Sequence, residues 1–145
     1  MFVVDTNILL YAADRSAPEH RVCRQFLQEC RAQTAPWHLT WGIIYEFIRV
    51  ATHPRVLRKP MSIDLAWKYI LGLRASPSLS LLQETERHSE VAGEVFEAVP
   101  LLSGNIIFDA RTAVLMKEHG LRKIHTRDTD FHRFPFLQVI DPLRN

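Results

Sequence analysis

Short apolar segments that suit strands alternate along this chain with longer segments that have the apolar spacing of amphipathic helices. The expected strands are residues 2–5, 35–39, 79–82, 121–126 and 137–140. Helices are expected from about residue 6 and over 16–33, 40–53, 62–75, 86–98 and 105–119. Because parallel strands need a crossover connection, which is usually helical, this order predicts a parallel sheet. We therefore predict an α/β fold with a central, mostly parallel β-sheet flanked by helices on both faces.

Side chains that cap helices support several of these boundaries. The sequence Ser16-Ala17-Pro18-Glu19 has the pattern of a capping box at the start of a helix. Thr40 and Ser62 are suitable N-caps for the two helices that follow them, and Gly120 is a suitable C-terminal cap.

Length and composition narrow the class of protein. A chain of 145 residues suits one domain, which we expect to span residues 1–145. A hydrophobic content of 47% and a charged content of 23% are ordinary for a globular protein and exclude a disordered chain. No apolar run is long enough to cross a membrane, and the N-terminus lacks the basic segment of a signal peptide. We expect a cytoplasmic protein without a membrane partner.

An acidic residue interrupts the apolar N-terminal sequence MFVVDTNILLYA. Asp5 lies between a strand former and a second apolar segment, so its carboxylate loses much of its hydration. One explanation is a helix cap, because Asp, Thr and Asn all accept hydrogen bonds from the first amides of a helix. The other is a metal ligand at the carboxyl end of a strand. On this segment alone the cap is the more economical explanation.

Further acids occupy positions where the pattern does not expect them. Glu46 lies at the border of an apolar helix stripe, and Asp109 lies within a helix that is apolar over most of its circumference. Ordinary structural roles are a pair with Arg49 for Glu46 and a buried ion pair for Asp109. Asp128 and Asp130 follow the fourth expected strand, where a polar turn is the ordinary explanation.

The order of strands brings these acids toward one place. In parallel α/β folds, sites form beyond the carboxyl ends of the strands, where Asp5 and Asp128 are expected. Carboxylates gathered there repel one another unless a cation lies among them, and oxygen ligands suit Mg²⁺ or Mn²⁺. Such a site supports phosphoryl chemistry with a metal-activated water. The sequence has no P-loop, dinucleotide fingerprint, serine elbow or zinc-ligand spacing.

Four segments resemble those of PIN-domain proteins, in order and spacing: VVDTNILLYA, WGIIYEFIRVATHPRVL, SGNIIFDARTAVLMKEHG and HTRDTDFHRFPFLQVIDPL. The chain looks most like the VapC ribonuclease toxins of type II toxin–antitoxin pairs. The resemblance implies a catalytic and metal-binding quartet, Asp5, Glu46, Asp109 and Asp128, that binds Mg²⁺ or Mn²⁺. It also implies supporting roles for Thr6, Asn7, Thr126 and Asp130, with Thr6 or Asn7 then left to cap the first helix.

The same resemblance implies an activity and partners. It indicates a metal-dependent endoribonuclease that hydrolyses RNA with water as nucleophile, forms a homodimer and is inhibited by a VapB-type antitoxin. Two alternatives stay open. One is a haloacid-dehalogenase-like phosphatase, although Asn7 stands where that family has its second Asp. The other is a catalytically silent PIN module that binds RNA or protein.

A basic loop offers a surface for RNA. Arg55, Arg58 and Lys59 form the densest group of cations in the chain, on a segment bracketed by Pro54 and Pro60. Arg127, next to Asp128, could also contact a phosphate or pair with Asp130. The alternative for the loop is an ordinary solvated surface.

Overall fold

The computed structural model describes residues 1–144, and the strands of this part of the chain form one parallel sheet. They are β1 (Phe2–Val4), β2 (Trp37–Thr40), β3 (Leu79–Leu82), β4 (Lys123–His125) and β5 (Gln138–Ile140). Their order in the sheet is β3-β2-β1-β4-β5, and every pair is parallel. The predicted α/β fold is confirmed.

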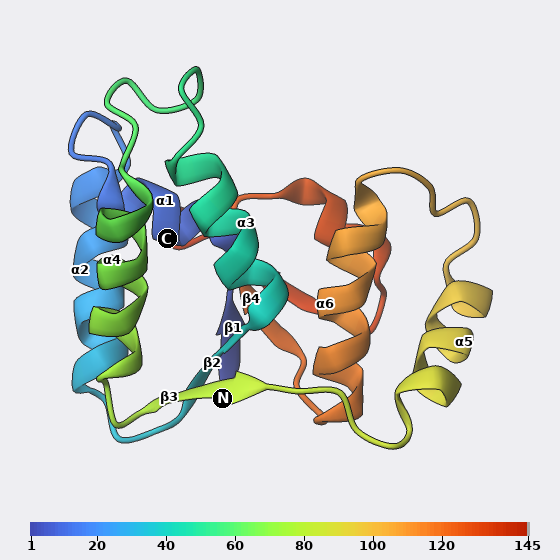
Figure 1. Cartoon of the computed structure of the whole chain (residues 1–145). Coiled ribbons are helices and arrows are strands. Elements are labelled where there is room, and N and C mark those ends of the chain that lie inside the picture. The colour runs from blue at the N-terminus through green and yellow to red at the C-terminus, as the bar shows by residue number, and fades with distance from the viewer. Residues whose placement is uncertain (145) are drawn as a thin grey trace.

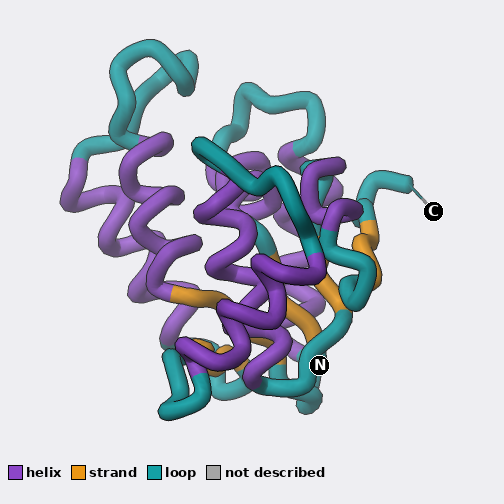
Figure 2. Tube along the Cα trace, turned by 90° about the vertical axis from the view of Figure 1, so that its right-hand side faces the viewer, coloured by secondary structure: helices purple, strands orange, loops and turns teal. Residues whose placement is uncertain are grey.

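Helices connect the strands and cover the sheet. They are α1 (Thr6–Ala13), α2 (His20–Ala32), α3 (Trp41–Ala51), α4 (Ile63–Arg74), α5 (His88–Ala98) and α6 (Ile106–Glu118), with a 3-10 helix over Thr129–Arg133. Figure 1 shows α2 and α4 on one side of the strands and α5 and α6 on the other. Figure 2, turned by 90°, shows the strands enclosed by helices and loops. None of the helices in residues 1–144 is long and apolar enough to cross a membrane.

The strand order explains this division of the helices. From β1 through β2 to β3 the chain moves outward in one direction, and it then returns past β1 to reach β4. Since such crossovers are right-handed, reversing the direction puts the helices on the opposite face. The reversal lies between β1 and β4, which is where α/β folds form their ligand sites.

Large buried side chains hold the layers together. Trp37, Phe47, Phe131 and Phe134 are almost completely buried. Trp37 keeps its polar group satisfied, because its Nε1 donates to Ser78 Oγ over 3.1 Å. The 3-10 helix, in a region that the sequence predicted as a loop, buries Phe131 and thereby fixes the segment that follows β4.

One predicted helix start is wrong and two are confirmed. The Ser16 hydroxyl donates to Asp14 Oδ1 over 2.7 Å and does not cap a helix, so residues 16–19 form turns and α2 begins at His20. Thr40 and Ser62 do cap their helices, since each side chain accepts from the amide of the third residue of α3 or α4. A serine two residues after an aspartate can bond to that side chain, and this local bond competes with capping a helix.

Candidate active site

The two central strands end beside each other and place acids at the same edge of the sheet. Asp5 follows β1 directly, and its amide donates to the carbonyl of His125 in β4 over 3.0 Å. Asp128 lies three residues beyond β4 and caps the 3-10 helix. The expectation that strand ends would bring Asp5 and Asp128 together therefore agrees with the topology.

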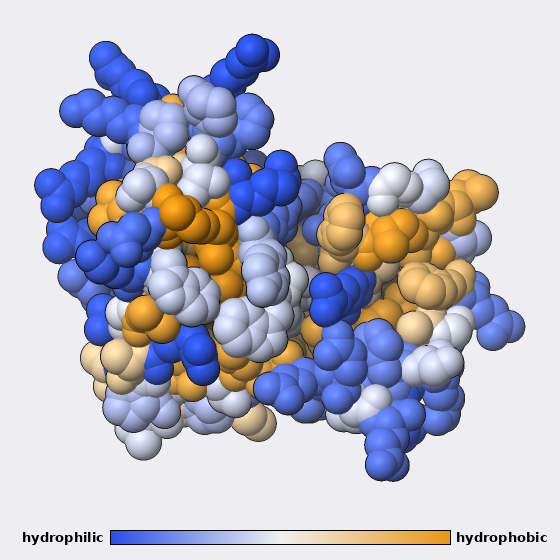
Figure 3. Space-filling view, viewed as in Figure 1, coloured by the Kyte–Doolittle hydropathy of each residue, from blue (hydrophilic) through white to orange (hydrophobic). Residues whose placement is uncertain are grey.

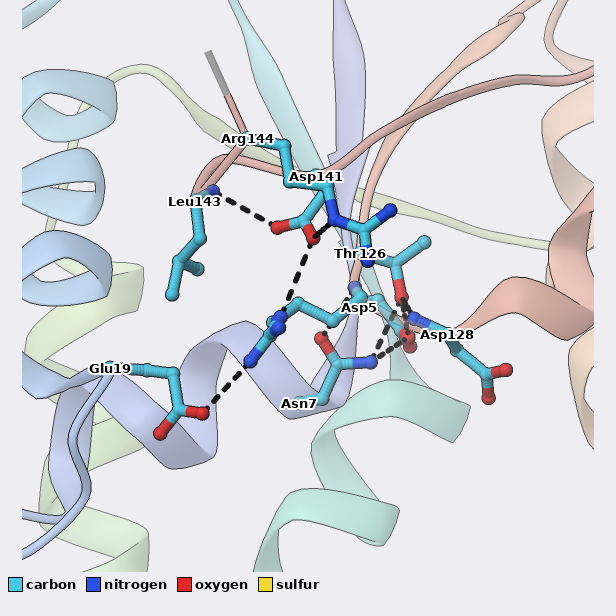
Figure 4. A network of polar contacts seen from close by, with 9 residues as sticks. Asp5, Asn7, Glu19, Thr126, Asp128, Asp141, Leu143 and Arg144 are labelled. Atoms are coloured by element: carbon cyan, nitrogen blue, oxygen red, sulfur yellow. Dashed lines mark hydrogen bonds and ion pairs between the residues drawn. The ribbon is translucent and has the colours of Figure 1, made fainter.

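Both oxygens of the buried Asp5 carboxylate are fixed by hydrogen bonds. Oδ1 accepts from the amide of Thr6 over 2.7 Å, which makes Asp5 itself the cap of α1. Oδ2 accepts from Asn7 Nδ2 over 2.8 Å and from Thr126 Oγ1 over 2.6 Å (Figure 4). The prediction that Thr6 or Asn7 would cap α1 is wrong, because the acid at the end of the strand is already aimed at the first amides of the helix.

Thr126 joins the two halves of this network. Its fully buried hydroxyl oxygen also accepts from Asn7 Nδ2 and from the amide of Asp128, each over 2.9 Å. Asn7 Oδ1 accepts in turn from the amide of Arg127 over 3.2 Å. Thr126 and Asn7 thus fix the start of the loop that carries Asp128.

Glu46 and Asp109 come from helices on opposite sides of this network. Thr6 Oγ1 donates to Glu46 Oε2 over 2.9 Å, whereas Arg49 stays 3.9 Å from Glu46 Oε1 in an exposed pair. Asp109 is half-buried in the first turn of α6. Within residues 1–144 it forms no ion pair, so the structural role considered for it, a buried pair with an arginine, is absent.

The acids face one cavity of about 620 Å³ between α3 and α6. Its lining includes Asp5, Glu46, Asp109, Asp128 and Asp130. The last three each place a carboxylate oxygen within 4.8 Å of the others. Asp130, which was predicted only as a supporting residue, therefore lies within the same 4.8 Å of Asp109 as Asp128 does. Its amide also donates to Asp128 Oδ1 over 2.8 Å.

Burial and mutual repulsion raise the pKa of two of these acids. Burial raises the pKa of Asp5 to about 6, with a further contribution from the negative charges of Glu46 and Asp128, against the hydrogen bonds from Thr126 and Thr6. Burial raises the pKa of Asp109 to about 7, with further contributions from the surrounding acids, Asp5 first. A group of carboxylates in this condition suits a cation, and a donor set of oxygens alone suits a hard divalent ion.

The predicted RNA-binding residues lie outside this cavity. Arg127 Nη1 is 2.8 Å from Glu19 Oε1, and its Nε is 3.4 Å from Asp141 Oδ2, so it pairs with these acids and not with Asp130. In Figure 4, Glu19 and the Asp128 carboxylate lie on opposite sides of the network. Arg55, Arg58 and Lys59 are exposed on the loop between α3 and α4.

Other residues that line the cavity were not assigned to the site from the sequence. Tyr45 and Arg49 face it from α3, and Phe108 and Arg111 face it from α6. Arg111 Nη2 also lies 2.9 Å from Glu84 Oε1. For two of them the sequence held a clue, because Tyr45 and Phe108 each immediately precede an acid of the cavity.

Comparisons with known proteins agree with this arrangement. The model of the PIN domain family matches residues 2–137. Ribonuclease VapC24 of Mycobacterium tuberculosis is 34% identical over 146 residues, covering 99% of this chain and 97% of the relative.

Two solved structures share the fold. VapBC2 from Rickettsia felis, bound to a DNA fragment from its promoter, has a TM-score of 0.67 at 15% identity and covers 96% of both chains. The sarcin-ricin loop cleaving toxin VapC20 of Mycobacterium tuberculosis has a TM-score of 0.66 at 14% identity, with 91% of this chain and 93% of that chain covered. The chain belongs to the PIN-domain family and, within it, to the VapC ribonucleases.

Proposed function

We propose that this protein is a divalent-metal-dependent endoribonuclease and the toxin of a VapBC-type toxin–antitoxin pair, with residues 1–145 as one PIN domain. The observation that carries the proposal is the convergence of acids from the end of β1, from α3, from α6 and from the segment after β4 on one cavity. Its similarity to Ribonuclease VapC24 over nearly the whole chain supports the reaction. The phosphatase alternative is not favoured, because Asn7 holds Asp5 and Thr126 and carries no proton to donate as an acid.

The proposed metal ligands and catalytic residues are Asp5, Glu46, Asp109 and Asp128. The fit rests on donor chemistry: these side chains offer only oxygens, and their crowding raises the pKa of Asp5 and Asp109. Mg²⁺ is the proposed ion, with Mn²⁺ as a substitute. When bound, the ion supplies an activated water and neutralises charge on the phosphate. Asp130 is close enough to the group to bind the same ion or a water on it.

The remaining residues of the network act on these acids. Thr126 and Asn7 hold Asp5 by its Oδ2, and the Thr6 hydroxyl orients Glu46. Fixing the carboxylates before RNA arrives avoids the entropy loss of ordering them during the reaction. Hydrolysis then forms a bond from the water oxygen to phosphorus and breaks the bond to one ester oxygen, which leaves with a proton.

The proposed partners are an RNA substrate, a VapB-type antitoxin and a second copy of the chain, in the cytoplasm. Support for the antitoxin comes from the fold shared with VapBC2. An exposed acidic cavity also fits a toxin that needs a partner to cover it when inactive.

The test is RNA cleavage by the purified chain with Mg²⁺, with Mn²⁺ and with EDTA, followed by mapping of the ends. We expect internal cuts with either metal and none with EDTA. Asp109→Asn is expected to remove most cleavage, while Asp64→Asn, an exposed acid on α4, serves as control. Full cleavage in EDTA, or release of free phosphate from a phosphomonoester without any RNA cut, would contradict the proposal. A wild type that binds RNA without cutting it would instead be a silent module.

A further inference from the structure

Two exposed aromatic side chains stand at the rim of the acidic cavity, one on each flanking helix. Tyr45 on α3 is 67% exposed, and Phe108 on α6 is 70% exposed. Both residues line the cavity. Rings of this size usually bury most of their surface, and neither of these belongs to the core. Because both rings are exposed and line the cavity with the carboxylates, they are candidates to contact a ligand bound there.

Each of these helices repeats the same pair of residue types. On α3, Arg49 follows Tyr45 by one turn, and on α6, Arg111 follows Phe108 by nearly one turn. All four side chains line the cavity. Figure 3 shows this face of the molecule, with a hollow between the side that carries α3 and the side that carries α6. The acids thus lie between two walls that each present a ring and a guanidinium group.

The cations are available for a new partner. Arg49 lies 3.9 Å from Glu46, and Arg111 lies 2.9 Å from Glu84, in pairs whose side chains are about half exposed or more. Exposed pairs of this kind contribute little free energy, so phosphate can replace the acid at little cost. Arg111 reaches α3, because a Cβ built at Gly42 would lie 3.6 Å from Arg111 Nη1, an ordinary van der Waals distance.

Aromatic rings interleaved with cations are the pattern by which proteins hold single-stranded nucleic acid. The bases of a single strand stack on the rings, and its phosphates pair with the cations. A duplex cannot use such rings, because its bases are already stacked on each other. Building on the function proposed above, we propose that Tyr45 and Phe108 are stacking platforms for the two nucleobases that flank the phosphodiester held by the acids. In this arrangement Arg49 and Arg111 contact the neighbouring phosphates of the same strand.

The test measures binding separately from cleavage. A short fluorescent single-stranded RNA of mixed sequence is titrated with the full chain in Ca²⁺, and a gel verifies that the strand stays intact. The second probe is a strand of the same length that has the sugar–phosphate backbone without bases. Tyr45→Ala and Phe108→Ala are each expected to weaken binding of the RNA about 5- to 150-fold. Both variants are expected to bind the base-free strand as the wild type does.

Conservative variants separate stacking from simple apolar contact. Tyr45→Phe and Phe108→Tyr retain a flat ring and are expected to bind RNA within about two-fold of the wild type. Tyr45→Leu and Phe108→Leu retain apolar surface without the ring and are expected to behave like the alanine variants. Leu101→Ala, at an exposed residue that does not line the cavity, serves as a control for an unrelated apolar surface. Because these positions are exposed, the variants are expected to fold, which thermal melting verifies.

Several results would overturn the inference. Unchanged RNA affinity in both alanine variants would do so, as would an equal loss for the base-free strand. Retention of RNA binding together with loss of antitoxin binding would assign the rings to the protein partner. A wild type that cuts no RNA refutes only the proposed function. Ring-dependent binding would then still support the platforms, so the two failures are distinguishable.

Discussion

Thr126 Oγ1 donates to Asp5 Oδ2 over 2.6 Å and joins residues that are 121 positions apart in the chain. The same hydroxyl oxygen accepts from Asn7 and from the amide of Asp128. One fully buried side chain therefore fixes the carboxylate after β1 and the loop after β4 relative to each other.

Replacing this hydroxyl tests its role. We expect Thr126→Val, which keeps the shape of the side chain, to lower the free energy of unfolding by about 2–3 kcal/mol, because buried groups lose their partner. Cleavage should fall more than the remaining folded fraction accounts for. Urea denaturation and cleavage rates measure the two effects. Thr126→Ser keeps the hydroxyl and is the control, and equal losses in Ser and Val variants would assign the effect to packing.

The raised pKa of Asp109 predicts how stability depends on pH. A carboxyl whose pKa rises on folding stabilises the fold while it is protonated, and this contribution is lost as pH rises from about 4 through about 7. Without metal, the free energy of unfolding of Asp109→Asn should therefore equal that of the wild type near pH 4. At pH 8 it should be more stable by about 1–2 kcal/mol, allowing for solvent screening of a half-buried group.

The comparison with the wild type is needed because other groups oppose this trend. Burial lowers the pKa of His38 and of His125, the latter to about 4, so both destabilise the fold as pH falls. Their effect is common to both proteins and cancels in the difference. Mg²⁺ should reverse the order at pH 8 by stabilising the wild type more. A difference that stays constant from pH 4 to 8 would show that Asp109 is not perturbed.

The pairing of Arg127 with Glu19 and Asp141 gives a third prediction. Arg127→Ala should lower the free energy of unfolding by about 1–2 kcal/mol, because two partly buried acids lose their cation. Glu19→Gln should lower the free energy of unfolding by less, because Arg127 is still present and still pairs with Asp141. If Arg127 bound phosphate, as the sequence suggested, its removal would weaken RNA binding while Glu19→Gln would not. Fluorescence-monitored unfolding and RNA titration separate these outcomes.

The loop with Arg55, Arg58 and Lys59 gives a fourth prediction. If its cations contact RNA, the triple alanine variant should bind more weakly and with a flatter salt dependence, by up to roughly 0.7 per lost contact on a log–log plot. Expression without antitoxin should also be less toxic. A triple alanine variant of Arg24, Arg122 and Lys123, which are exposed elsewhere in the chain, controls for net charge. If RNA affinity depends on salt with the same slope in the triple variant of the loop and in the wild type, the loop is an ordinary solvated surface.

The sequence by itself determined the order of strands and helices in this protein and identified most of the acids that line the cavity. The alternation of strands and helices predicted the parallel sheet, and the strand-end rule predicted that Asp5 and Asp128 would meet. Both follow from backbone geometry that short-range patterns report. Asp109 was found because a charge within an apolar helix breaks a periodic pattern. Thr40 and Ser62 capped their helices because a cap depends on residues only a turn away.

Only the tertiary structure decided which side chains gather around those acids. The path of the 3-10 helix puts Asp130 beside Asp109, and the placement of α3 opposite α6 brings Tyr45 and Phe108 to one cavity. The structure also gave Arg127 a partner 108 positions away, where the sequence offered Asp130 nearby. Helical periodicity tells which face of a helix is apolar but not which helix it will oppose. That choice is made by packing the whole core.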